Sequence, residues 1–295
     1  MERLFDFSDY DQLIPMVQNS LIAGLLLGIM GGLIGVFVMT RDMSFAVHGI
    51  SELSFAGAAI ALLIGFNVAL GATFGSIVAA IIIAIMGTRA KDRNSIIAVL
   101  MPFGLGIGIL ALALYEGRAA NKFGLLTGQI IAVDDPQVIW LIATSLVVVI
   151  ALLVIWRPLS FASLDPEVAE ARGVPTKALG IIFMLLLALA VAASVQIVGA
   201  LLVMTLLVTP AAAALRLTSS PLLVPILSMV FAVVAVVGGI LLALGGGLPI
   251  SPYVTTLSFA IYLVARVIEK SRGSSSDMLC LKRLALFPLS SFTKC

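Results

Sequence analysis

Long apolar runs with at most one Lys, Arg, Asp or Glu constrain the fold of this chain more than any other feature. A membrane-spanning helix needs about 20 consecutive, mainly apolar residues. Nine runs come close to or exceed that length: 13–39, 43–65, 68–87, 95–115, 137–156, 177–196, 199–215, 221–244 and 250–268. We therefore expect an all-α polytopic membrane protein with about nine transmembrane helices, within a range of eight to ten.

The composition supports this class and excludes others. Hydrophobic residues make up 61% of the 295 residues and charged residues only 11%, whereas about 25% of a soluble domain is charged. A soluble enzyme, a nucleic-acid-binding protein and a disordered chain are excluded. We expect a multi-pass protein of the cell membrane that contacts lipid and no nucleic acid, with one transmembrane domain over 13–268, an N-terminal segment over 1–12 and a tail over 269–295.

Two divisions between spans have weak signals. Asn67 is the main polar break between Gly65 and Val68, and a single 39-residue apolar stretch, 177–215, has to be cut between Gln196 and Gly199. These two places decide whether the count is eight, nine or ten.

The basic residues give an orientation. Lys and Arg concentrate in cytoplasmic loops. With the N-terminus outside and the C-terminus inside, alternation of nine spans places 14 of the 17 basic residues inside: Arg41, Arg89, Lys91, Arg93, Arg157, Arg172, Lys177, Arg216, Arg266, Lys270, Arg272, Lys282, Arg283 and Lys294. We therefore expect the segment 1–12 to be extracytoplasmic and the tail 269–295 to be cytoplasmic.

One ionisable pair falls inside a span. His48 is the only histidine, and Glu52 follows it by four residues, which places both on one helix face. Such groups at membrane depth usually mark a pathway or site. Glu52 could simply hydrogen-bond to His48 or to a nearby hydroxyl. The pair could instead relay protons, or bind Mn²⁺, Fe²⁺ or Zn²⁺ with two further ligands from a symmetric second copy.

The inner connection at 165–173 has the signals of a short helix with defined ends. Asp165 suits the N-cap, Pro166 the first helical position and Glu167 the positive end of the helix dipole. Gly173 suits a left-handed C-terminal residue. So short a helix is unstable alone in water, so it either folds back on its own bundle or docks a cytoplasmic partner.

No G-x-x-x-x-G-K-[ST] stretch occurs in the sequence, and no inner loop is long enough for a nucleotide-binding domain. We expect no enzymatic activity in this chain. Any ATPase that drives it must be a separate subunit.

Three ordered motifs resemble one family. RDMSFAVHGISELSFAGAAI (41–60), SLDPEVAEARG (163–173) and QIVGALLVMTLLVTPAAAA (196–214) are similar to the signatures of the permease subunits of zinc, manganese and iron(II) ABC importers, the ABC-3 family. The resemblance runs from about Gly24 to Arg266.

The resemblance implies a homodimer of permeases, two cytoplasmic ATP-binding cassette subunits and an extracytoplasmic metal-binding protein. It implies a transported divalent metal but no permanently bound cofactor. Residues 163–173 correspond to the segment that inserts into the ATPase, which gives Asp165, Pro166, Glu167, Ala169 and Gly173 a coupling role. The family commonly has Asp or His at the position of His48 and His at that of Glu52, so Glu52 is a departure that favours Mn²⁺ or Fe²⁺ over Zn²⁺.

The third motif is expected to line the translocation path or the dimer interface, because small residues and a proline permit close helix approach and freed backbone groups. With one serine of the span 43–65, the expected residues are Ser51, Gly199, Thr205, Thr209 and Pro210. A lipid-facing helix with incidental small residues is the alternative for each position.

Other functions remain open at this level. A secondary transporter or channel could use His48 and Glu52 as a proton or ion site without an ATPase. An intramembrane enzyme ranks last, because the spans contain no HExxH and no convincing nucleophile with a base.

Overall fold

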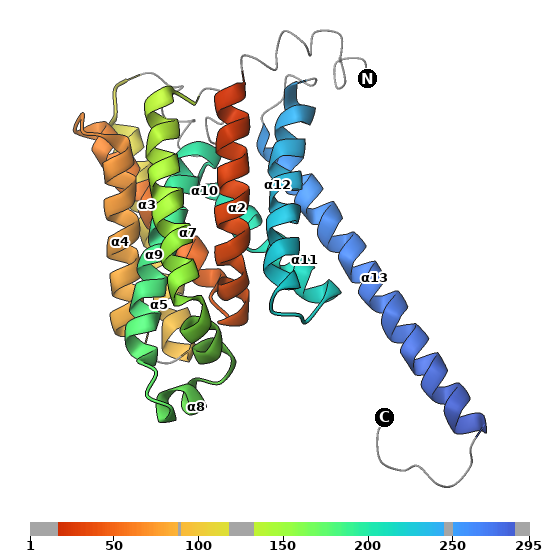
Figure 1. Ribbon diagram of the computed structural model, residues 1–295. Coiled ribbons are helices and arrows are strands. Elements are labelled where there is room, and N and C mark those ends of the chain that lie inside the picture. Colours follow the sequence, from red (N-terminus) through yellow and green to blue (C-terminus); the bar gives the residue numbers. More distant parts are fainter. Residues whose placement is uncertain (1–16, 88–89, 118–132, 245–249, 287–295) are drawn as a thin grey trace.

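The computed structural model describes residues 17–87, 90–117, 133–244 and 250–286. The regular elements of the described residues are all helices (Figure 1). In chain order, the helices are α2 (Gln18–Thr40), α3 (Ser44–Leu63), α4 (Val68–Met86), α5 (Ala90–Leu114), α7 (Asp135–Leu164), α8 (Pro166–Ala171), α9 (Thr176–Val198), α10 (Ala200–Leu207), α11 (Thr209–Leu217), α12 (Leu223–Leu244) and α13 (Ile250–Leu286). The expected segment 1–12 lies outside the described residues.

Eight of the described helices are long and apolar enough to cross a membrane, which confirms the all-α polytopic class and lies within the expected range. The expected single span over 199–215 is different, because it is divided into α10 and α11. Gly199 has a left-handed φ of 85°, and α11 begins at Thr209 with Pro210 in its first turn. Proline lacks an N–H and disfavours helical geometry in the preceding residue, so the chain breaks near Val208.

The weak division between the second and third expected spans is confirmed. Gly65 has a φ of 71° after α3, a conformation that glycine adopts without steric cost. The Asn67 side chain then caps α4 by accepting hydrogen bonds from the N–H groups of Ala69 and Leu70, at 2.9 and 3.2 Å.

Two helices extend beyond the expected spans. Helix α7 continues through Pro158 to Leu164, because Leu159 and Ala162 on its last turns are buried. Helix α13 continues past the expected end of the last span at 268 and reaches Leu286, extending away from the other helices (Figure 1).

Glycines set how closely the helices approach. On α2, a Cβ atom at Gly32 would lie 2.6 Å from the Met229 Cα of α12, and the Ser228 hydroxyl donates a hydrogen bond to the Gly32 carbonyl at 2.7 Å. Lipid is as apolar as leucine, so close packing and interhelical hydrogen bonds hold such helices together. Helices α2, α3 and α9 are the most buried, and the other long helices surround them.

The connections that were expected inside gather at one end of the bundle. The α2–α3 and α11–α12 connections and the C-terminal end of α4 lie toward the same end as the short helix α8 (Figure 1). Helices α10 and α11 lead the chain back toward that end, and the start of α2 and the end of α13 lie at opposite ends of the bundle (Figure 1).

Candidate functional site

His48 and Glu52 lie one helical turn apart on α3 and form a close pair. Their Nε2 and Oε1 atoms are 3.7 Å apart, and the His48 side chain is 29% exposed whereas that of Glu52 is 6% exposed. This distance is too long for a hydrogen bond. The expectation that both side chains share one helix face is confirmed, but they do not satisfy each other's hydrogen-bonding capacity.

Two atoms of this pair are buried without any hydrogen-bond partner: Nδ1 of His48 and Oε2 of Glu52. The neighbouring hydroxyls donate elsewhere, because Ser51 donates to the His48 carbonyl at 2.8 Å and Ser54 to the Ala72 carbonyl at 3.0 Å. Buried polar atoms without partners are uncommon and costly. The arrangement therefore leaves a ligand-capable nitrogen and oxygen free, and Glu52 has no hydrogen bond to a nearby hydroxyl.

Helix α5 fixes the position of Glu52. A Cβ atom at Gly104 would lie 3.0 Å from the Glu52 carbonyl carbon and 2.7 Å from the Leu53 Cδ1, and Gly108 packs directly against the Phe55 ring. On its other side, α3 packs Gly57 against Gly71 and Gly75 of α4. The small residues of α3 and its neighbours thus hold the Glu52 backbone in a close-packed setting.

The pair has two potential metal ligands. Among the described residues, no group of three or more His, Cys, Asp or Glu side chains is placed to hold a metal ion. One imidazole and one carboxylate suit Mn²⁺, Fe²⁺ or Zn²⁺, but two protein ligands leave most of a coordination shell to water or to another chain.

Arginines fix the turn that precedes α3. Arg93 of α5 donates hydrogen bonds from Nη2 to the carbonyls of Arg41 and Asp42, both at 3.3 Å. Asp42 has a left-handed φ of 51°, which is unusual for a non-glycine residue. The Arg41 guanidinium lies over the Phe183 ring of α9, with Cζ 5.5 Å from the ring centroid.

An aromatic cluster supports Arg41. The Phe37 ring of α2 packs edge-on against Trp156 of α7 and Phe183 of α9, with centroid distances of 4.7 and 6.0 Å. Sequence reasoning missed these contacts, because aromatic residues inside long apolar runs carry no signal of their partners. The only available signal was Arg41, a charge placed directly at the end of a span.

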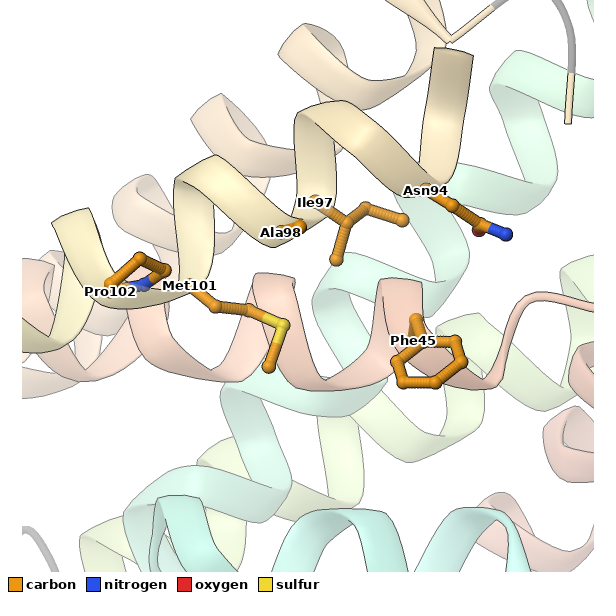
Figure 2. Close-up of a pocket in the computed structure, with 6 residues that line it drawn as sticks. All are labelled: Phe45, Asn94, Ile97, Ala98, Met101 and Pro102. Carbon is orange, nitrogen blue, oxygen red and sulfur yellow. The ribbon is translucent and has the colours of Figure 1, made fainter. Parts of the chain in front are cut away.

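Beside this turn, α3 and α5 enclose an open groove of about 380 Å³. Figure 2 shows Asn94 and Phe45 at one end of the groove and Pro102 at the other, with Ile97, Ala98 and Met101 between them. Phe45 lies on the same face of α3 as Gly49 and Glu52. Its side chain is 60% exposed, whereas Gly49 and Glu52 are buried. The α3–α5 contact therefore opens toward the turn that contains Arg41.

The helix expected at 165–173 is present as α8. The Asp165 carboxylate accepts a hydrogen bond from the Val168 N–H at 3.0 Å, Pro166 is the first helical residue and Gly173 has a φ of 80°. Ala169 is fully buried, whereas Val168 is 44% exposed and Glu167, Glu170 and Arg172 are exposed. The helix therefore packs on its own bundle through one residue and presents its other side chains to the surroundings.

Of the residues expected near the path, Ser51 lies on α3, and Gly199 and Thr205 belong to the α10 segment beside α3, whereas Thr209 and Pro210 lie on α11. Helix α10 contacts α2, α3 and α9. Ser51, Gly199 and Pro210 are buried, and Thr205 and Thr209 are half-buried. The Thr205 carbonyl accepts a hydrogen bond from Ser258 of α13 at 3.5 Å, so α10 connects the α3 side of the bundle to α13.

Comparison with known proteins finds one matching family and relatives that are similar over most of the chain. The profile of the ABC 3 transport family matches residues 13–269. The manganese transport system membrane protein MntC of Halalkalibacterium halodurans is 30% identical over 234 residues, which cover 78% of this chain and 80% of the relative. The manganese import system permease protein ScaB of Streptococcus parasanguinis is 27% identical over 275 residues, covering 93% of this chain and 98% of the relative.

Solved structures agree. A chain of PsaBC from Streptococcus pneumoniae in complex with Fab superposes with a TM-score of 0.79 at 25% identity, covering 88% of this chain and 95% of that chain. An inward-facing conformation of a putative metal-chelate type ABC transporter gives a TM-score of 0.69 at 17% identity and covers 89% of this chain and 92% of that chain. The second similarity shows the fold alone.

Proposed function

Because the chain belongs to the ABC 3 transport family, we propose that it is the permease subunit of an ATP-driven importer of divalent transition-metal ions. It is a multi-pass protein of the cell membrane. The curated relatives named above are manganese transport proteins, which makes Mn²⁺ the first candidate substrate, with Zn²⁺ and Fe²⁺ as competitors. The family's permease subunit is not itself catalytic, so ATP hydrolysis belongs to a separate cytoplasmic subunit.

The observation that carries the metal assignment is the pair of buried, unpartnered atoms on His48 and Glu52. An ion that loses its water in a low-dielectric passage needs replacement ligands, but a complete rigid shell would hold it too tightly for release. Two ligands per chain, duplicated around a two-fold axis by a second copy, meet both demands. Neutral imidazole is required for coordination, so protonation of His48 weakens metal binding, and binding releases a proton.

Manganese uptake by cells that lack other importers tests the pair. We expect Glu52→Gln, which keeps the side-chain shape and removes its charge, to reduce uptake at limiting Mn²⁺ at least tenfold, and His48→Ala to do the same. Glu269→Gln is the control, because that carboxylate is exposed and pairs with Arg216 at 3.3 Å. Wild-type uptake by both pair variants would leave His48 and Glu52 as structural residues.

The same assay separates the importer from a secondary transporter or channel. Uptake should stop when the Walker A lysine of the ATPase subunit is replaced, and Zn²⁺ and Fe²⁺ added as competitors should rank the metals. Uptake that persists without ATP hydrolysis would support the transporter or channel.

Helix α8 is the proposed docking element for the ATPase, with Asp165, Pro166, Glu167, Ala169 and Gly173 defining its shape. Its exposed Glu167 and Val168 and its position at the end of the bundle support this role. The helix lies between α7 and α9 in the chain and contacts both, so a displacement of α8 acts directly on two long helices.

Gly173→Val tests the docking role with a matched control. A β-branched residue at a φ of 80° is strained, so we expect loss of ATPase co-purification. Gly65→Val is the control, because it imposes similar strain at a φ of 71° with no atom within 4 Å of the new Cβ. Gly65 follows the C-terminal end of α3 and is not part of α8. Normal ATPase assembly and metal-stimulated hydrolysis by Gly173→Val would refute the docking role, and loss by both variants would point to general instability.

Helices α10 and α11 are the proposed wall of the path or of the dimer interface. The contact of α10 with α3 and the break near Val208 support the assignment of Ser51, Gly199, Thr205, Thr209 and Pro210. Thr205→Cys and Thr209→Cys should react with a water-soluble thiol reagent or cross-link between subunits during transport. Inaccessibility throughout the cycle together with no cross-linking would contradict it.

The remaining partners follow from the family. We propose a second copy of the chain, two cytoplasmic ATP-binding cassette subunits and an extracytoplasmic metal-binding protein. The distribution of basic residues supports a cytoplasmic location for α8 and an extracytoplasmic N-terminus.

A further inference from the structure

Arg41 and Arg93 form a positively charged pair, and Asp42 is the acidic residue whose charge acts on Arg93. The Nη1 atom of Arg41 and the Nε atom of Arg93 are buried without hydrogen-bond partners. Among the described side chains, no carboxylate oxygen lies within 4.0 Å of either guanidinium. Burial, and secondarily the nearby charge of Arg93, lower the pKa of Arg41. Two adjacent, partly desolvated cations are costly unless an anion pairs with them.

The groove shown in Figure 2 is lined by residues close in the chain to this arginine pair, while neither arginine lines it. Arg93 and Asn94 are consecutive, and Phe45 follows Asp42, whose carbonyl accepts a hydrogen bond from Arg93, by three residues. Away from the polar Asn94, the lining is apolar: Phe45, Ile97, Ala98, Met101 and Pro102. The arginine pair is therefore next in the chain to the Asn94 and Phe45 end of an apolar groove.

The dimensions match one leaflet of a bilayer. The groove follows α5 from Asn94 to Pro102, which is about 12 Å at the rise of an α-helix, and half of a hydrocarbon core is about 15 Å. Asn94 lies next to the first residue of the candidate span Arg93–Leu114, so the arginines are at headgroup level and the apolar lining is at acyl-chain level.

We propose that this site binds an anionic phospholipid, with the phosphate on Arg41 and Arg93 and one acyl chain in the groove along α5. Guanidinium groups match phosphate oxygens with two parallel hydrogen bonds. Basic pockets between transmembrane helices on the cytoplasmic side are known to hold anionic headgroups, and this end of the bundle also carries α8.

The groove favours a lipid over two other sources of negative charge. Inorganic phosphate would use the arginines and leave the apolar lining exposed. A carboxylate from a soluble partner could reach the arginines from the aqueous side, but the groove runs along a membrane-spanning helix that such a partner cannot enter. Only a lipid uses both parts of the site.

Native mass spectrometry of the full-length chain tests the site. The delipidated chain is titrated with phosphatidylglycerol and with phosphatidylcholine of the same acyl chains. We expect one phosphatidylglycerol to bind at least tenfold more tightly than phosphatidylcholine. Arg41→Gln and Arg93→Gln should each reduce this preference at least fivefold, whereas Arg216→Gln, which alters an exposed arginine paired with Glu269, should leave it unchanged.

Ala98→Trp tests the groove without touching the arginines. Ala98 is exposed, so the larger side chain can occupy the groove without disturbing the core, and we expect it to reduce phosphatidylglycerol binding at least fivefold. Thermal unfolding of each variant shows whether it is folded, and Arg41→Lys with Arg93→Lys should retain part of the preference.

Three outcomes would overturn the proposal. Equal phosphatidylglycerol binding by all variants would mean that no such site exists. Displacement of the lipid by millimolar phosphate, with no effect of Ala98→Trp, would show a free-anion site. Unchanged lipid binding by the arginine variants, together with loss of ATPase association, would assign the arginines to a protein contact.

Discussion

The two ends of the α3–α5 contact differ in how they are packed. Toward the middle of the helices, Gly104 and Gly108 allow α5 to touch the α3 backbone, and Phe55 is fully buried. Toward the turn at Arg41, the same two helices border the groove, and Phe45 is 60% exposed. Glu52 lies in the closed part and His48 toward the open part, so one helix carries both a buried and a more accessible ionisable side chain.

The largest expected effect is on the stability of the closed part. Phe55→Ala removes a buried ring, which costs about 3–5 kcal/mol in soluble cores. Since lipid is as apolar as the ring, we expect about 2–4 kcal/mol here, measured by unfolding in mild detergent. Phe45→Ala is the matched control on the same helix and should cost less than about 1 kcal/mol, as expected for an exposed position. Similar losses of unfolding free energy in both variants would mean that the two ends of the α3–α5 contact do not differ in packing.

Overpacking the closed part should have the next largest effect. Gly104→Ala places a Cβ 2.7 Å from the Leu53 Cδ1 and 3.0 Å from the Glu52 carbonyl carbon. We expect a loss of about 1–3 kcal/mol and reduced metal uptake, because Glu52 is displaced. Gly106→Ala on the same helix meets no atom within 4 Å and should leave both unfolding and uptake unchanged. Unchanged unfolding and uptake in Gly104→Ala would show that α3 and α5 can move apart to accommodate the added methyl group.

Chemical access should change along α3. In a chain whose Cys280 and Cys295 are replaced by serine, we expect Phe45→Cys to react with N-ethylmaleimide in detergent at least tenfold faster than Ala56→Cys. Position 45 is 60% exposed and position 56 is 6% exposed. Equal rates would mean that the α3–α5 contact opens along its whole length.

The smallest effect concerns the turn at the open end. Phe183→Leu keeps an apolar side chain but removes the ring face under Arg41, and a partly exposed cation–π contact contributes about 0.5–1 kcal/mol. We expect a loss of that size in thermal unfolding, and a double-mutant cycle with Arg41→Met should attribute it to the pair. Phe74→Leu is the control, because Phe74 is 71% exposed. No coupling in the cycle would mean that the ring does not hold Arg41.

Much of the fold could be read from local patterns. The long apolar runs predicted eight of the observed long helices, since each span must satisfy its own backbone hydrogen bonds in lipid. Asp165, Pro166 and Gly173 predicted the ends of α8, because caps depend on residues within one helical turn. The one incorrect element is the single span over 199–215, which is divided into α10 and α11. It contains Gly199 and Pro210, and the sequence alone does not show that the helix is interrupted near both residues.

The sequence by itself determined that His48 and Glu52 share a helix face, because a spacing of four residues fixes that geometry. Only the tertiary structure decided that the Ser54 hydroxyl donates to the Ala72 carbonyl of α4 and that Oε2 of Glu52 is buried without a hydrogen-bond partner among the described residues. It also brought Arg93 beside Arg41, 52 residues away in the chain, and formed a groove that α3 and α5 border. Such contacts depend on which faces of distant helices meet, and apolar runs in lipid carry little information about their partners because lipid and protein are equally apolar.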